Sequence, residues 1–88
     1  MELKELTRAK ENFYKCLDLN PTYYPSMIGL ANVLYSEFNY VKSEDLLRQA
    51  IALEPNDSHG HISLGNTLMA MKVIKYIYIE IHRSNRLL

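Results

Sequence analysis

Two prolines, Pro21 and Pro55, stand 34 residues apart, and each closes a similar six-residue phrase, at 16–21 and at 50–55. When the chain is shifted by 34 residues, further identities fall into the same register: Ile28 on Ile62, Leu30 on Leu64, Asn32 on Asn66 and Leu34 on Leu68. An internal repeat of this length constrains the fold strongly, because such units stack in a row and each packs only against its neighbours.

Small and large residues recur in each repeat at intervals of three and four, which places them on one stripe of a helix. Small residues let helices approach closely, and large ones fill the space between them. Pro21 and Pro55 should each end a helix, because proline disfavours the helical conformation of the preceding residue. We predict helices at about 2–19, 24–37, 40–53 and 58–71. The predicted core is Ala9, Phe13, Cys16, Leu30, Ala31, Leu34, Leu47, Ala50, Leu64, Gly65 and Leu68.

Polar residues suit the predicted helix ends. Asn56, Asp57 and Ser58 are N-cap candidates for the helix that follows them. Asn39 is a candidate for a left-handed turn conformation between the second and third helices, because a short polar side chain tolerates that backbone.

The period and the residue classes resemble the tetratricopeptide repeat, in which two antiparallel helices form each unit. The full unit has Met27, Leu30, Ala31 and Leu34 on its first helix, and Ser43, Leu47, Ala50 and Pro55 on its second. The resemblance implies an all-α fold of helical hairpins, an α-solenoid fragment. Residues 1–71 would then hold the second helix of one repeat, one full repeat and the first helix of the next.

A narrower resemblance rests on residues 20–34 and 43–51. These stretches are similar to the C-terminal repeats of the tetratricopeptide repeat protein 7 family. Members of that family scaffold a phosphatidylinositol 4-kinase at the plasma membrane, so the resemblance implies a scaffolding role.

The C-terminal segment departs from the repeat pattern. Residues 72–88 contain no turn residue where the hairpin should bend, and Ile77 stands where a small residue is expected. Ile81, Ser84 and Leu87 could continue the helical stripe, but alternating isoleucine and tyrosine favours β-structure. We therefore predict an irregular, degenerate tail at 72–88. We also interpret the chain as a fragment of a longer solenoid, whose uncapped ends would favour self-association.

The tetratricopeptide resemblance implies a concave face lined by the first helix of each repeat. The residues that it places there are Asn32, Tyr35, His59, Ser63, Asn66 and Met69. Two equivalent asparagines could pair with the backbone of an extended peptide, since a carboxamide both donates and accepts hydrogen bonds. The alternative is that they are ordinary solvated positions. Lysine and arginine are missing from this set, so the carboxylate clamp of chaperone-binding members of the family is not expected.

Charge adds little to this interpretation. Ten basic and ten acidic residues balance, which gives no global indication of nucleic-acid binding. Basic and aromatic residues are interleaved in 72–88, so a lipid or nucleic-acid contact is an alternative to an accidental cluster. The single cysteine excludes an internal disulfide, and the N-terminus does not resemble a signal peptide. We expect an intracellular, cytoplasmic protein.

Catalytic patterns are missing from the sequence. It shows no nucleophile–histidine set, no phosphate-binding glycine loop and no paired carboxylates. His59 and His61 are two apart, so on a helix they point in different directions and do not suggest a metal site. We predict a protein–protein interaction scaffold with no enzymatic activity, cofactor or metal, which binds a protein or peptide. The alternative is a spacer segment of a longer solenoid that has no ligand of its own.

Overall fold

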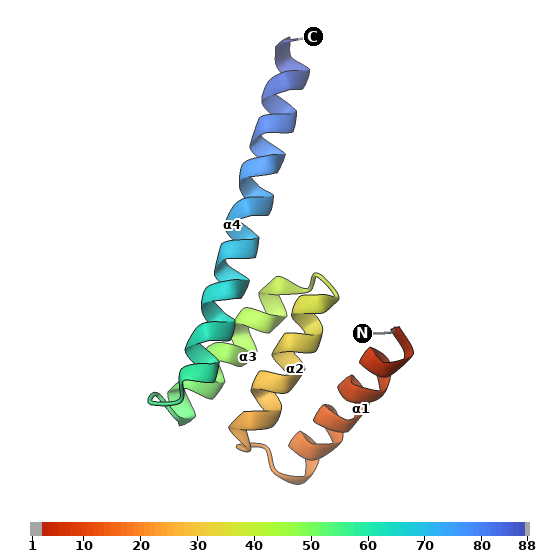
Figure 1. The fold of residues 1–88 in the computed structure, drawn as a ribbon, viewed down its shortest axis with the longest axis vertical. Coiled ribbons are helices and arrows are strands. Elements are labelled where there is room, and N and C mark those ends of the chain that lie inside the picture. The colour runs from red at the N-terminus through yellow and green to blue at the C-terminus, as the bar shows by residue number, and fades with distance from the viewer. Residues whose placement is uncertain (1–2, 88) are drawn as a thin grey trace.

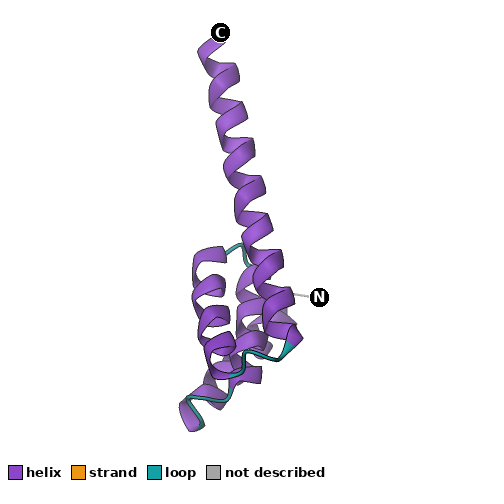
Figure 2. Ribbon diagram, turned by 90° about the vertical axis from the view of Figure 1, so that its left-hand side faces the viewer, coloured by secondary structure: helices purple, strands orange, loops and turns teal. Residues whose placement is uncertain are grey.

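The computed structural model describes residues 3–87, which form four helices joined by short turns (Figures 1 and 2). They are α1 (Leu3–Leu19), α2 (Tyr24–Ser36), α3 (Tyr40–Leu53) and α4 (Ser58–Leu87). Successive helices run antiparallel, and α4 rises well beyond the other three (Figure 1). The predicted all-α fold of helical hairpins is therefore confirmed, and the first three helices match their predicted bounds to within one residue.

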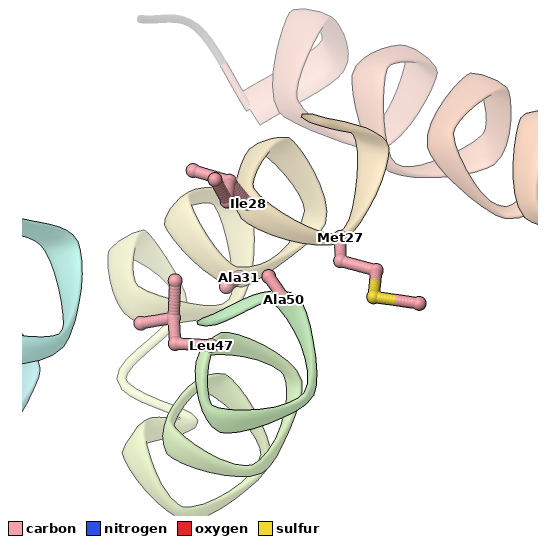
Figure 3. Packing of buried hydrophobic residues seen from close by; sticks show 5 residues of the cluster. All are labelled: Met27, Ile28, Ala31, Leu47 and Ala50. Carbon is pink, nitrogen blue, oxygen red and sulfur yellow. The ribbon is translucent and has the colours of Figure 1, made fainter. Parts of the chain in front are cut away.

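The core lies where α2 meets α3. Leu30, Ala31, Leu47 and Ala50 are almost completely buried there. Figure 3 shows Leu47 beside Ala31 and Ala50, with Met27 and Ile28 in the same buried cluster. Two alanines at the crossing allow the helices to approach closely, and the leucines fill the space on either side.

A buried pair of hydroxyl groups joins α2, α3 and α4. The Ser43 hydroxyl donates a hydrogen bond of 2.9 Å to the carbonyl oxygen of Ala31, and it lies 3.3 Å from the Thr67 hydroxyl. Both side chains are fully buried. A serine at this point therefore fills a tight crossing and also satisfies a second buried polar group.

Gly29 lets the Phe13 ring of α1 approach α2 closely. A Cβ atom built at Gly29 would overlap the ring of Phe13. The same interface contains a 2.8 Å hydrogen bond from the Ser26 hydroxyl to the Cys16 thiol sulfur and a 2.9 Å ion pair between Lys10 and Glu37. Ala9, Phe13 and Cys16 are half-buried, because only α2 packs against α1 in the described chain.

The turn between α2 and α3 differs from the prediction. The left-handed residue is Phe38, with φ 65°, whereas the predicted residue, Asn39, has φ −91° and precedes the first turn of α3. The Phe38 side chain is 77% exposed, so the ring points away from the core. The turn thus places an aromatic side chain at an exposed corner of the bundle.

The fourth helix corrects the prediction of an irregular, β-prone tail. α4 continues without interruption to Leu87, a length of 30 residues, or about 45 Å. The residues that favour β-structure remain helical here because the missing turn leaves nothing to stop the helix, and no strand partner exists within residues 3–87. Although α4 is long, no helix in this range is apolar enough over its length to cross a membrane.

The outer side of α4 also departs from the predicted core. Gly65 is exposed, and nothing lies within 4 Å of a Cβ atom built on it. Leu68 is 39% exposed, and Leu64 is only half-buried. In the preceding repeat, α3 covers the equivalent Ala31 and Leu34. Because α4 does not fold back, no helix of the described chain covers this side.

Candidate partner-binding face

The six residues predicted for the concave face lie on α2 and α4, which are in contact with each other. We call this surface the α2–α4 face. Its members are Asn32, Tyr35, His59, Ser63, Asn66 and Met69. On α4, the ten residue-to-residue steps from His59 to Met69 cover about 15 Å along the axis. All except Tyr35 and Ser63 are exposed, and those two are half-buried.

The first groove on this face lies near the start of α4. It has a volume of about 300 Å³ and contains Asn32 from α2 and His59 from α4. Its apolar wall comes from Phe13 and Ile28, and Gly29 forms part of its floor. A pocket therefore combines one predicted carboxamide with an aromatic ring from a third helix.

The second groove lies two helical turns further along α4. It has a volume of about 360 Å³ and contains Tyr35, Asn66 and Met69. The Tyr35 ring meets the ring of Tyr40 edge to face, with 5.3 Å between their centroids. Edge-to-face packing holds both rings in place while leaving their outer surfaces accessible. The groove is thus a preformed aromatic wall beside a flexible methionine.

Ser63 belongs to neither groove. It lies on α4 one turn after His59 and one turn before Asn66. The structure therefore brings two predicted residues into the first groove and three into the second, with a small polar side chain between them.

A hydrogen-bonded carboxylate stands at the rim of the first groove. Asp57 Oδ1 accepts a 2.9 Å bond from the backbone N–H of His59 and lies 2.9 Å from His59 Nδ1. The bond from the His59 backbone, followed by bonds from the His59 and Tyr24 side chains, lowers the pKa of Asp57 below its ordinary value. The hydrogen bond between Tyr24 and Asp57 also raises the pKa of the Tyr24 hydroxyl. Asp57 therefore caps α4 and keeps a negative charge beside the groove.

The two histidines of the His59-x-His61 pair have separate environments. His61 Nε2 lies 2.8 Å from the carbonyl oxygen of Pro55, while His59 pairs with Asp57. The His61 side chain is exposed on α4 and contacts the turn that precedes this helix. Within the described residues, no group of three potential metal ligands comes together.

Several residues that line the grooves were not predicted for this face. Phe13 was assigned to the core, although its ring borders the first groove. Tyr40, Val73 and Ile74 line the second groove. The interrupted repeat pattern hid Val73 and Ile74, which were placed in an irregular tail. The aromatic pair at positions 35 and 40 was a possible signal for Tyr40.

Comparison with known families agrees with the fold. A family model described as a tetratricopeptide repeat matches residues 1–70. Comparisons with curated proteins and with solved structures gave no match, so the narrower resemblance to the tetratricopeptide repeat protein 7 family stays a prediction.

Proposed function

We propose that this chain, which belongs to the tetratricopeptide repeat family, holds an extended segment of a partner protein against its α2–α4 face. Tetratricopeptide repeats generally mediate protein–protein interaction. The observation that supports a site on this face is the pair of grooves, because five of the six predicted residues line them.

The dimensions of the face suit a short peptide. The distance from His59 to Met69 along α4 is about 15 Å. An extended chain rises about 3.3 Å per residue, so roughly five residues would cover both grooves. Alternate side chains of such a peptide point the same way. Two of them can enter the two grooves while the backbone between them passes over Ser63.

The chemistry of the two grooves differs. The first offers the carboxamide of Asn32 beside the ring of Phe13, with the Asp57 carboxylate at its rim. The second offers Asn66 beside Tyr35 and Met69. In each groove one carboxamide can pair with peptide backbone while an apolar wall accepts a side chain. The proposed ligand is therefore a peptide with two apolar side chains on one face.

The test is binding of the 88-residue chain to an array of extended peptides, compared with an Asn32→Ala/Asn66→Ala variant. We expect the variant to lose the peptides that the parent chain selects, with dissociation constants raised at least tenfold, about 1.4 kcal/mol. An Asn12→Ala/Asn56→Ala variant is the matched control, since it removes two exposed carboxamides away from the face. Equal loss in both double variants, or no loss in the first, would exclude the proposed site.

A spacer role is the second candidate function, and the outer side of α4 supports it. Gly65 has open space around it and Leu68 is 39% exposed, at positions that are covered in the preceding repeat. A helix of an adjoining repeat fits there, and the present helices would then serve only to bury their neighbours. The spacer role predicts that no peptide is selected by the parent chain and that both asparagine variants behave as it does.

A further inference from the structure

The part of α4 that extends beyond the bundle carries a regular apolar seam. Ala70, Ile74, Ile77, Ile81 and Ser84 recur at intervals of four and three residues. This is the heptad spacing with which one helix packs along another, and β-branched isoleucine is common at such positions. Ile74, Ile77 and Ile81 are 49%, 52% and 55% exposed. We call these five residues the α4 seam.

The α4 seam continues the side of α4 that packs against α3 within the bundle. Ser63 and Thr67 precede Ala70 at the same intervals, and Thr67 is fully buried against Ser43 of α3. The seam therefore leaves the bundle on the side that faces α2 and α3. Above the turn between those helices, it forms an inside corner with the top of the bundle (Figure 1).

A groove occupies this corner. It has a volume of about 410 Å³ and is lined by Phe38 of the turn, by Tyr40 and Val41 at the start of α3, and by Met71, Ile74 and Tyr78 of α4. Phe38 and Val41 are 77% and 72% exposed. Two strongly exposed apolar side chains of the bundle thus adjoin the start of the uncovered seam.

We propose that the α4 seam binds the α4 seam of a second copy of this chain, with the two helices antiparallel. This interaction goes beyond the peptide-binding role and is argued from other observations, although the seam shares Ala70 and Ile74 with the second groove. If the two-fold axis passes near residue 79, Ile77 of each copy faces Ile81 of the other, and Ile74 faces Ser84. The seam from Ile74 to Ser84 is complementary to itself in this register, because each of these layers joins two residues of the seam, and Ala70 lies outside the paired segment.

The antiparallel register also accounts for the corner groove. Ser84 of one copy lies opposite Ile74 of the other copy, which lines the corner groove. A parallel arrangement would instead place Ser84 of each copy beside Ser84 of the other, away from both grooves.

The apolar area available is what such an interface needs. Burial of a branched aliphatic side chain removes about 60–120 Å² from water, and an aromatic side chain buries about 150–250 Å². Scaled by their exposure, Ile74, Ile77, Ile81, Val41, Phe38 and Tyr78 offer roughly 450 Å² per copy. Two copies together reach roughly 900 Å², the apolar share of an interface of about 1,600 Å².

A helix fits this corner better than a membrane does. A flat bilayer laid along the seam would first meet α2 and α3, which project on the same side. Lys72, Lys75 and Arg83 lie on the opposite side of α4, by helical spacing, and would point away from lipid headgroups. The α4 helix of a second copy can enter the corner while its charged side faces water.

The first test is the mass of the 88-residue chain in solution, measured by sedimentation equilibrium over a range of concentrations. We expect a dimer, twice the 10.3 kDa of one chain. Ile77→Glu/Ile81→Glu should raise the dissociation constant at least 100-fold, because two charges per copy would enter the seam. Ile79→Glu, on the other side of the same helix and 44% exposed, is the matched control and should remain a dimer. Circular dichroism establishes that each variant stays helical.

A monomeric parent chain at concentrations up to about 1 mM, or equal weakening by Ile79→Glu, would overturn the proposal. Binding of a monomeric chain to phosphatidylserine–phosphatidylcholine vesicles through Ile77 and Ile81 would likewise overturn it and assign the seam to a membrane. The orientation is tested by disulfide formation in a Cys16→Ala background. An equal mixture of Ile77→Cys and Ile81→Cys chains should cross-link to each other. Cross-linking of Ile77→Cys to itself would indicate a parallel pair and refute the register.

Discussion

Leu47 is the residue whose truncation should damage the fold most. Its side chain is fully buried in the cluster formed by α2 and α3, with Ala31 and Ala50 as neighbours (Figure 3). Leu47→Ala removes this packing and leaves a cavity. The two alanines carry no side-chain length with which to fill it, so we expect little relaxation of the site.

The expected loss is large relative to the stability of a chain this size. Fully buried leucines truncated to alanine cost about 3–5 kcal/mol where the cavity persists. The total free energy of unfolding of an 88-residue domain is about 4–13 kcal/mol. Each kcal/mol shifts the melting temperature of a domain this small by about 4–8 °C. We therefore expect Leu47→Ala to lower the melting temperature by at least about 12 °C, or to leave the chain unfolded.

The assay is urea unfolding monitored by far-ultraviolet circular dichroism. All chains are measured at one protein concentration, because association would alter the apparent stability. Leu53→Ala is the matched control, since the same truncation is made on the same helix at a side chain that is 45% exposed. It should cost less than about 1 kcal/mol. Equal losses for the two variants, or a loss below about 1 kcal/mol for Leu47→Ala, would refute the placement of the core.

Three further variants test particular contacts. Gly29→Ala should lower the melting temperature, because the added methyl group overlaps the Phe13 ring. Phe13→Leu in the same chain should recover part of this loss. An unchanged melting temperature for Gly29→Ala would contradict the close approach of Phe13 to Gly29. Ser43→Ala should cost about 1–3 kcal/mol in urea unfolding, since a fully buried polar partner is removed, whereas a loss comparable to that of an exposed serine would argue against burial. Asp57→Ala should destabilise the chain at neutral pH by removing the cap of α4. The pKa of this carboxyl is depressed in the folded state, so its contribution is present above the ordinary aspartate pKa and lost as pH falls through the lower folded value. The difference in melting temperature between parent and variant should thus shrink in acid, and a difference that persists there would contradict this role.

Much of the fold follows from the spacing of residues in the sequence. The 34-residue period placed α1, α2 and α3 almost completely, because Pro21 and Pro55 end helices and the small–large pattern identifies the crossing of α2 and α3. Leu30, Ala31, Leu47 and Ala50 lie at that crossing. Such a pattern is local and periodic, so it can be interpreted without knowing the tertiary structure.

Features that depend on what lies opposite a helix were harder to predict. Gly65 and Leu68 have the residue types of a core position, but burial requires a neighbouring helix, and α4 does not fold back to supply one. Gly29 carries no periodic signal of its own. Its role appears only when the Phe13 ring is placed against it.

The two backbone errors have related causes. Residues 72–87 were interpreted from their β-preference, whereas a helix that has already begun needs a stop signal more than it needs strong helix formers. At the α2–α3 turn, Asn39 has the residue type expected for a left-handed backbone, yet Phe38 adopts it. The hairpin geometry decides which residue takes that conformation, and Phe38 points outward, where its ring meets the edge of the Tyr40 ring.

The candidate face was predictable as a set of positions but not as two grooves. The repeat resemblance placed Asn32 and Asn66 at equivalent points of α2 and α4. The apolar walls beside them come from Phe13 on α1 and Tyr40 on α3. A pattern within single helices does not show which side chains of neighbouring helices complete a pocket.

The most direct test of the proposed function is nuclear magnetic resonance of the isotope-labelled 88-residue chain, titrated with a peptide selected from the array. Binding on the α2–α4 face predicts that the largest amide shift changes fall in residues 28–36 and 57–74. They should include both Asn32 and Asn66, and the outer surfaces of α1 and α3 should be unaffected. Shift changes confined to the α4 seam, to the outer side of α4 around Gly65, or spread evenly over all four helices would contradict a binding site on this face.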